Sequence, residues 1–353
     1  MESAALDRLG WSPFFSERFS TYRGEGLQPG RVSADYGVAF NVSTATGDLV
    51  GRVTGKLRHD GPGPNDRPVV GDWVAIEAGS GDSGSIHAIL ERKSAFSRKV
   101  AGETTEVQVM AANIDRVFVV SALSDDLNQA KLERYLTIGW ESGALPVVLL
   151  TKADLSPDLE AVRERVEAIA PGATILVTSS VTGKGLDMVR RELGPGITAV
   201  LVGPSGAGKS TLINHLTGRD DLATGALRGD GKGRHTTTRR QLIPIDSGGM
   251  IIDTPGIREL QVWHGEEGLE QTFDDIAQLA LGCRFNNCDH ESEPGCAVQT
   301  AILGGTLPAE RLASYRKLGR EIRAMRRRED KRLQIEDKNR WKAIEKANRS
   351  RLK

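Results

Sequence analysis

The sequence lacks a long apolar run and a signal segment, and each absence excludes a class of protein. No stretch approaches the roughly 18 consecutive apolar residues that a membrane-spanning helix needs. The first fifteen residues, MESAALDRLGWSPFF, contain acidic side chains and no basic segment followed by an apolar one. They therefore do not resemble a secretory signal. We expect a cytoplasmic chain without membrane contact.

Cysteine is also scarce, with three residues in the whole chain, all within fourteen positions. An odd number of cysteines in a cytoplasmic chain argues against disulfide bonds. The spacing Cys-x₄-Cys-x-His-x₅-Cys brings three thiolates and one imidazole together, the donor set of a closed, tetrahedral structural Zn²⁺ site. Free structural cysteines are the alternative. We predict one zinc ion per chain, held by Cys283, Cys288, His290 and Cys296.

The chain has 353 residues and no net charge, but its charge is unevenly distributed. From Arg311 to Lys353 there are 17 Lys and Arg against 6 Asp and Glu, which leaves 30 basic and 41 acidic residues elsewhere. A basic tail on an acidic body indicates a polyanionic partner such as nucleic acid. Residues 311–349 have apolar positions at partly helical spacing and are expected to form a long basic helix. A solvated helical face or a frayed tail is the alternative.

Two contrasting patterns precede this tail. Short alternating runs between residues 31 and 100, separated by Gly, Asp and Pro clusters, predict a small antiparallel barrel or sandwich. A five-stranded oligonucleotide-binding (OB) barrel fits the length, as other small barrels do. Residues 101–267 instead alternate continuous apolar strands with amphipathic segments, which indicates a parallel sheet covered on both faces. The expected organisation is an extension (1–30), an OB-like β-barrel (31–100), an α/β domain (101–267) and a mainly helical zinc-binding module (268–353).

A phosphate-binding loop begins immediately after the apolar run 198–202. The sequence GPSGAGKST fits G-x-x-x-x-G-K-[ST] and opens a helical segment, which is the context that this motif requires. Backbone N–H groups of such a loop surround phosphates, the lysine reaches the β- and γ-phosphates and the following serine ligates Mg²⁺. The predicted nucleotide-binding residues are Gly203, Pro204, Ser205, Gly206, Ala207, Gly208, Lys209, Ser210 and Thr211.

The sequence DTPG at 253–256 ends another apolar run, 249–252. At this distance after a phosphate loop, the Asp253 carboxylate is expected to hold Mg²⁺ through water and Gly256 to bond the γ-phosphate. A switch loop should lie between the two motifs. One threonine of 236–238, with Thr237 preferred, is expected to complete the Mg²⁺ coordination.

A guanine-reading loop, TKAD, follows the apolar run 145–150. An aspartate carboxylate accepts hydrogen bonds from the N1–H and N2–H₂ of guanine, which adenine does not offer, so the site rejects adenine. The predicted base-reading residues are Thr151, Lys152, Ala153 and Asp154, with Ser179 and Ser180 offering a backbone N–H to guanine O6. Thr151 stands where Asn is usual and is expected to alter affinity.

The guanine loop precedes the phosphate loop, the reverse of the order in ordinary GTPases. The motif order is fourth, fifth, first, second and third, which is that of a circularly permuted GTPase, with Gly194-Pro195-Gly196 joining the old ends. The nucleotide-sensing segment 249–257 then leads directly into the cysteine module. We therefore expect a γ-phosphate-dependent change at Gly256 to move that module.

With the barrel and the cysteine module, the architecture over about residues 30–320 resembles the ribosome small-subunit-dependent GTPase A family. The matching stretches are VVGDWV (69–74), AANIDRV (111–117), TKADL (151–155), the phosphate loop, GRHTTT (233–238), DTPG and CRFNNCDHESEPGC. Ile257 occupies the place of the usual water-positioning glutamine, and the resemblance implies His235 as the catalytic residue. An imidazole that accepts from the attacking water is worth about 10²–10⁴ in rate.

The expected enzyme is a Mg²⁺-dependent GTP hydrolase that turns over slowly alone. The resemblance implies stimulation by the small ribosomal subunit, a role in its late maturation, contact with its rRNA and a monomeric state. The alternative is a nucleotide-gated RNA-binding scaffold in which hydrolysis is incidental. An ATP-dependent kinase is disfavoured by TKAD and by the lack of a second substrate signature.

Overall fold

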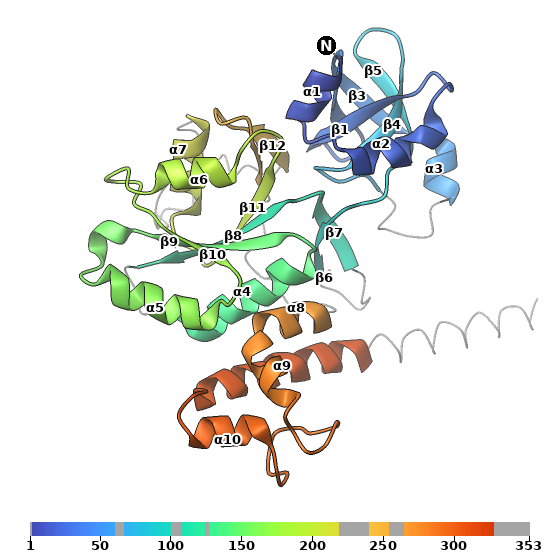
Figure 1. Cartoon of the computed structure of the whole chain (residues 1–353). Helices are drawn as coiled ribbons and strands as arrows, with labels where there is room; N and C mark the ends of the chain where they lie inside the picture. Colours follow the sequence, from blue (N-terminus) through green and yellow to red (C-terminus); the bar gives the residue numbers. More distant parts are fainter. Residues whose placement is uncertain are drawn as a thin grey trace, which may run out of the picture.

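The computed structural model describes residues 2–60, 67–99, 107–123, 127–218, 240–253 and 265–327. Figure 1 shows a small barrel, a central sheet with helices on both faces and a helical C-terminal part on the side of the sheet away from the barrel. No helix within these ranges is both long and apolar enough to span a membrane.

The first part is a closed five-stranded barrel, as the alternating pattern predicts. Its strands pair in the order β1-β2-β3-β5-β4, and β4 pairs again with β1 to close it. Alternate side chains such as Val42, Ile76 and Ile86 fill the interior and are fully buried. This order agrees with the predicted OB-like type. The elements are β1 (Gln28–Asp35), β2 (Phe40–Thr44), β3 (Gly47–Val53), α3 (Gly55–Asp60), β4 (Trp73–Ala78) and β5 (Ser83–Ile89).

The N-terminal residues, which have no clear period, form short helices against this barrel: α1 (Glu2–Arg8), α2 (Pro13–Phe19) and η1 (Ser20–Tyr22). Trp11 and Phe15 contact the buried Trp73 of β4, with ring centroids 4.6 and 5.7 Å from it. Each of the two α-helices has only seven residues, too few turns to give a visible helical period. Strand β1 also begins within residues 1–30, at Gln28.

Within the described residues, the central sheet contains six strands in the spatial order β10-β9-β8-β11-β13-β12, and β9, β11 and β13 match the predicted apolar runs 145–150, 198–202 and 249–252. Along β8, Val117 and Val119 face one helical layer, α4 and α5, whereas Phe118 and Val120 face the other, α6 and α7. The bounds are β8 (Arg116–Ala122), α4 (Gln129–Glu141), β9 (Leu145–Thr151), α5 (Leu159–Ile169), β10 (Thr174–Val177), α6 (Leu186–Glu192), β11 (Thr198–Val202), α7 (Lys209–Thr217), β12 (Gln241–Pro244) and β13 (Met250–Asp253).

One strand of this sheet departs from the expected parallel arrangement. β12 pairs antiparallel with β13, while β10, β9, β8, β11 and β13 run parallel. The turn between β12 and β13 is tight, with Ile245 N donating to Gly249 O at 2.9 Å and Gly248 at φ 86°. A turn this short can join only antiparallel strands. The apolar run of β12 predicts a strand but carries no information on the direction of that strand.

The barrel meets the sheet at the stretches VVGDWV and AANIDRV. A hairpin of β6 (Ala95–Lys99) and β7 (Val107–Ala112) lies between the two parts. Gly71 has φ 95°, and a Cβ there would lie 2.1 Å from Ala112 O. Asn113 Nδ2 donates to Gly71 O at 3.0 Å. The glycine and the asparagine are therefore needed for the two stretches to fit together.

Arg31 of β1 fastens the same interface and is only 1% exposed. Its guanidinium donates to Gly71 O at 3.3 Å, to Asn113 O at 3.0 Å and to Leu9 O. Burial lowers the pKa of Arg31 to about 10, although nearby Asp115 and Asp72 raise it. The side chain is therefore charged at neutral pH and bonds three separate segments.

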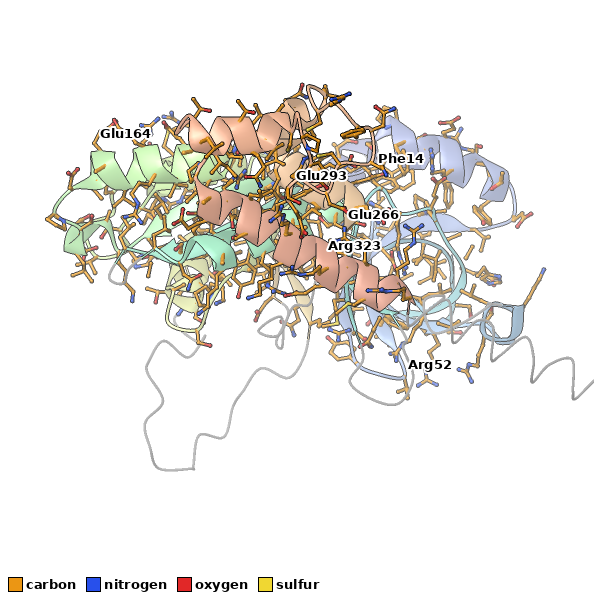
Figure 2. The ribbon with its side chains drawn as sticks, turned by 90° about the horizontal axis from the view of Figure 1, so that it is seen from below. Phe14, Arg52, Glu164, Glu266, Glu293 and Arg323 are labelled. Carbon is orange, nitrogen blue, oxygen red and sulfur yellow. The ribbon has the colours of Figure 1, made fainter. Side chains whose placement is uncertain are left out.

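The C-terminal part comprises α8 (Glu266–Thr272), α9 (Asp274–Ala280), α10 (Ala297–Leu303) and a last helix that runs from residue 309 to 327, the end of the described chain. Figure 2 views the molecule from this side, with the last helix, marked by Arg323, in front and Glu266 of α8 beside it. Phe273 and Ile322 belong to one continuous hydrophobic cluster with Leu136 of α4. The module thus shares its core with the central sheet and its helices.

Candidate functional site

The phosphate-loop sequence forms a tight turn between β11 and α7. Gly203, Gly206 and Gly208 have φ 143°, 81° and 89°, which L side chains rarely adopt. A Cβ on Gly203 would also lie 2.2 Å from Val120 O of β8. Lys209 Nζ donates to Gly203 O at 2.7 Å and to Pro204 O at 2.6 Å. The ammonium group is therefore held at the loop, at the N-terminus of a nine-residue helix that favours anions.

Asp253 ends β13, which pairs in parallel with β11, the strand that leads into the phosphate loop. Because parallel strands end at the same edge of a sheet, the Asp253 carboxylate and Ser210 of α7 lie on the same side of the molecule as the loop. Burial raises the pKa of Asp253. A divalent cation at this edge would favour the ionised carboxylate and offset that cost.

The predicted guanine loop lies at the same edge, after β9. Lys152 has φ 58°, and Ala153 N donates to Thr178 O at 3.1 Å, which joins this loop to the one after β10. Ser179 Oγ donates to the Asp154 carboxylate. The side chain that is expected to read guanine is therefore oriented by a neighbouring hydroxyl group. Ser180 follows in a half-buried position.

Thr151, which stands where asparagine is usual, forms a side-chain hydrogen bond to the phosphate loop. Its Oγ1 donates to Ala207 O of the phosphate loop at 2.6 Å and lies 3.3 Å from Ser121 O at the end of β8. The threonine hydroxyl thus connects the base loop to the phosphate loop through one buried hydrogen bond. Sequence reasoning did not predict this bond, because the two residues are 56 positions apart.

The reversed motif order still leaves the loops at one edge of the sheet, because the pairing of the strands brings the loops together whatever their order in the chain. Gly194-Pro195-Gly196 links α6 to β11, and Gly196 N donates to Gly248 O at 3.1 Å. The base loops follow β9 and β10 and the phosphate loop follows β11, with β8 between them. The geometry is that of a nucleotide site assembled by a permuted chain.

Comparisons with known proteins give the family. Residues 89–263 match the model of the RsgA GTPase family. A relative from Opitutus terrae, "Small ribosomal subunit biogenesis GTPase RsgA", is 42% identical over 357 residues, which cover 98% of this chain and 97% of the relative. The chain belongs to the RsgA GTPase family. It is therefore a GTP-hydrolysing enzyme.

Two solved structures agree with the fold. The "Crystal structure of YjeQ from Thermotoga maritima" matches with a TM-score of 0.64 and 26% identity, over 84% of this chain and 98% of that one. "The crystal structure of YloQ, a circularly permuted GTPase" matches with a TM-score of 0.64 and 25% identity, over 86% and 97%. The predicted fold, a small barrel followed by a permuted GTPase and a cysteine module, is confirmed.

The four predicted zinc ligands lie close together in the C-terminal part. Their donor atoms all lie within 4.8 Å of one another. Cys283 Sγ lies 3.9 Å from Cys296 Sγ and 3.6 Å from His290 Nδ1, and Cys296 Sγ lies 3.5 Å from that nitrogen. A tetrahedral zinc ion with bonds of about 2.0–2.3 Å needs ligand separations of roughly 3.5–3.8 Å. The cluster therefore has the right size to hold a metal ion.

Local structure explains how this short loop reaches that arrangement. His290 has φ 58°, and its carbonyl oxygen accepts from Gln299 Nε2 of α10 and from Arg316 of the last helix. Cys296 caps the N-terminus of α10. Burial lowers the pKa of His290, which favours the neutral imidazole that binds metals. The Cys283 thiol is raised in pKa by burial, but backbone N–H groups at the start of α10 more than offset this and lower its pKa overall.

Three predicted site residues, His235, Thr237 and Gly256, lie outside the described residues, as does Ile257. Their roles stay predictions.

A cavity of about 300 Å³ beside the phosphate loop did not follow from the sequence. Its walls come from the end of β8, the first turns of α4 and the loop residues Pro204, Ser205 and Ala207. Asn128, the N-cap of α4, and Tyr135 are among its lining residues. The phosphate-loop residues lie far along the chain from β8 and α4, so no local pattern could have predicted this wall.

Proposed function

We propose that the chain binds GTP and Mg²⁺ at this edge and that its hydrolysis of GTP is stimulated by the small ribosomal subunit. The observation that carries the nucleotide assignment is the pair of side-chain bonds Thr151–Ala207 and Ser179–Asp154, which join the base loops and the phosphate loop into one site. Both bonds serve guanine specificity, since one fixes the loop and the other orients the carboxylate.

Each predicted residue has a role in this proposal. Asp154 accepts from guanine, and the phosphate-loop N–H groups with Lys209 bind the phosphates. Ser210, Thr237 and Asp253 would hold Mg²⁺, which supplies positive charge to the β- and γ-phosphates when bound. His235 accepts a proton from the attacking water. Cys283, Cys288, His290 and Cys296 would hold Zn²⁺ in a structural role, and the ion would fix the loop between α9 and α10.

The partner is proposed from the relatives and from the surface chemistry of the chain. The relatives from Opitutus terrae and Streptomyces coelicolor carry the name "Small ribosomal subunit biogenesis GTPase RsgA". The OB-like barrel and the last helix, with Lys317, Arg320, Arg323 and Arg327 exposed, suit contact with rRNA phosphates. We infer a cytoplasmic monomer that acts late in maturation of the small subunit, with the barrel at 31–100, the GTPase domain at 101–267 and the zinc module at 268–353.

The deciding experiment is the GTP hydrolysis rate with no addition, with small subunits and with large subunits. We expect stimulation by small subunits alone. Equal rates in all three conditions would contradict the stimulated enzyme. If GTP then still raised the affinity for small subunits over GDP, the nucleotide-gated scaffold would take its place. Single-turnover hydrolysis on the purified complex separates chemistry from product release.

A further inference from the structure

Arg311, on the last helix, uses every hydrogen-bond donor of its guanidinium group although it is only 2% exposed. Nε and Nη2 each donate to the Asp275 carboxylate at 2.9 Å. Nη1 donates to Glu133 Oε1 at 2.9 Å and to Ile169 O at 3.1 Å, and Nη2 also donates to Thr272 O at 2.7 Å. The group is thus fully satisfied, in the planar geometry that suits arginine and not lysine.

These partners belong to two different parts of the molecule. Asp275 and Thr272 lie on α9 and α8 of the C-terminal module. Glu133 lies on α4 and Ile169 ends α5, both of which cover the central sheet. Arg311 also lies over the ring of Phe273 at 4.4 Å. One side chain therefore fixes the orientation of the module on the GTPase sheet.

Glu133 depends on this contact more than a surface carboxylate would. It is completely buried, and among the described residues its Oε1 accepts from Arg311 and from Gln129 Nε2, the latter at 2.8 Å. Among the described residues its second oxygen, Oε2, has no hydrogen-bond partner. A buried carboxylate with a single cationic partner is held where that cation is. The position of α4 is therefore tied to the position of Arg311.

The same helix forms a wall of the cavity beside the phosphate loop. Asn128 and Leu132 line the cavity together with Ser205 and Ala207, and Leu132 directly precedes Glu133. A second contact makes α4 and α8 one unit, since a Cβ on Gly268 would lie 2.3 Å from Thr137 O. An α-helix is stiff over this length, about 7.5 Å from Asn128 to Glu133. A displacement of the module would consequently reach the cavity wall at the phosphate loop.

We propose that Arg311 and Glu133 are positioning residues that transmit docking of the C-terminal module to the phosphate site through α4. This inference rests on the proposed stimulation by the small subunit. The coupling route runs through the packing of α4 against the C-terminal module, on the face of the sheet opposite α7. It adds to the chain connection that leads from β13 into the module. The pair sets how well the phosphate loop responds to the subunit, without touching nucleotide.

The test uses Arg311→Lys, which keeps the charge but not the fork, and Glu133→Gln, which keeps the shape but not the charge. Arg326→Gln is the control, because Arg326 of the same helix makes an exposed ion pair with Glu266 of α8 at 2.6 Å. For the full chain we would measure kcat and KM for GTP, alone and with saturating small subunits, and the affinity for the subunits. Both test variants should keep basal kcat, KM and subunit affinity while the stimulated kcat falls about tenfold or more. The control should keep the wild-type basal kcat and the wild-type stimulated kcat at saturating subunits.

A merely structural role predicts a different result, in which basal and stimulated rates fall by the same factor or subunit affinity is lost. Either result, or full stimulation in a folded variant, would overturn the proposal.

If wild-type protein itself is not stimulated, the proposed function fails, and a second measurement still decides whether the module and the phosphate site are coupled. Amide hydrogen exchange of residues 265–327 with GDP and with a non-hydrolysable GTP analogue should differ in wild type and not in Glu133→Gln. No difference in wild type would end the inference.

Discussion

At the scale of single residues, the site depends on small side chains that bond to backbone atoms. Thr151 is the clearest case, because its hydroxyl group reaches Ala207 O, which a bulkier or apolar residue would leave without that bond. A hydrogen bond depends on the donor atom and its reach and not on the name of the residue. Threonine at this position therefore connects the base loop to the phosphate loop.

Thr151→Val tests this role, since valine has nearly the same shape but no hydroxyl group. The change leaves the buried Ala207 carbonyl without this donor, which costs about 1–3 kcal/mol. We expect weaker binding of both GTP and GDP and a lower free energy of unfolding. Titration of labelled GDP and chemical denaturation measure the two quantities. Thr151→Ser keeps the hydroxyl group and should retain both; a loss with serine equal to that with valine would count against the bond.

Asp154→Asn should change which base the site accepts. Each hydrogen bond to a charged group is worth about 1.5–3 kcal/mol. The substitution removes the two hydrogen bonds from guanine to the carboxylate and therefore lowers GTP affinity by roughly a hundredfold or more. The amide can donate to the extra carbonyl of xanthine, so xanthosine triphosphate should now bind better than GTP. Competition of GTP, ATP and xanthosine triphosphate against labelled GDP measures this. Equal competition by ATP and GTP in wild type would reject the guanine assignment.

At the scale of elements, the crossing of α4 and α8 brings a carboxyl group into a tight contact. Glu141, at the end of α4, accepts from Gly268 N of α8 at 3.1 Å. Burial raises the pKa of Glu141 to about 7, the Gly268 N–H lowers it, and Glu267 and Glu266 on α8 raise it. The native state therefore holds this proton more tightly than the unfolded chain does. The stabilisation is complete below about pH 4.3 and is lost as the pH rises to about 7.

Glu141→Gln removes this titration while an amide oxygen can still accept from Gly268. The variant should melt higher than wild type above pH 7, and the difference should shrink toward pH 5. Glu141 is half-exposed, so we expect a difference of about 2 °C or less. Thermal unfolding from pH 5 to pH 8 checks the trend. Glu164→Gln on the exposed face of α5 (Figure 2) is the control; a pH-independent difference for Glu141→Gln would contradict the assignment.

The loop that carries the four predicted zinc ligands, residues 283–296, is the element expected to depend most on a ligand. Elemental analysis of metal-replete protein should find one zinc per chain, and Cys288→Ser should lower that content. Because α8 and the last helix share their core with α4, chelation should loosen residues 283–296 and leave those helices in place. Hydrogen exchange before and after chelation measures this. Wild-type protein without stoichiometric zinc would rule out the metal, and loss of α8 on chelation would rule out the shared core as its support.

At the scale of the whole molecule, buried arginines hold the parts together. Arg31 joins the barrel to the sheet, and Arg311 joins the C-terminal module to the helices of the sheet. In both cases the guanidinium group bonds several segments at once, so its removal leaves more than one acceptor unsatisfied. The three parts are therefore joined by direct side-chain bonds in the described structure.

His235→Ala tests the catalytic assignment in the assembled system. With saturating small subunits, we expect stimulated turnover to fall by about 10²–10⁴, because the attacking water loses its acceptor. GTP affinity and subunit binding should stay close to wild type. Lys209→Ala should instead weaken nucleotide binding itself. Stimulated turnover at the wild-type rate in His235→Ala would exclude this residue and point to a group from the subunit.

The sequence alone was enough for everything that depends on local spacing. Glycines at the loop positions, a lysine after them and an aspartate after an apolar strand identify the nucleotide motifs, because each motif is one turn of chain with fixed chemistry. Cys-x₄-Cys-x-His-x₅-Cys predicts a metal cluster for the same reason, and the apolar runs 145–150, 198–202 and 249–252 predict three strands of the central sheet. The permuted order also follows from sequence, since it concerns only the succession of motifs.

The tertiary structure decided what depends on contacts between distant segments. The antiparallel direction of β12 follows from the turn at Gly248, the bond from Thr151 follows from the meeting of two loops, and the cavity wall follows from α4 lying beside Ser205. The five donors of Arg311 found acceptors on four other elements and segments, which no periodicity could indicate. Local patterns determine which residues can bond, but folding determines which of them meet, because burial and chain connectivity act over the whole molecule at once.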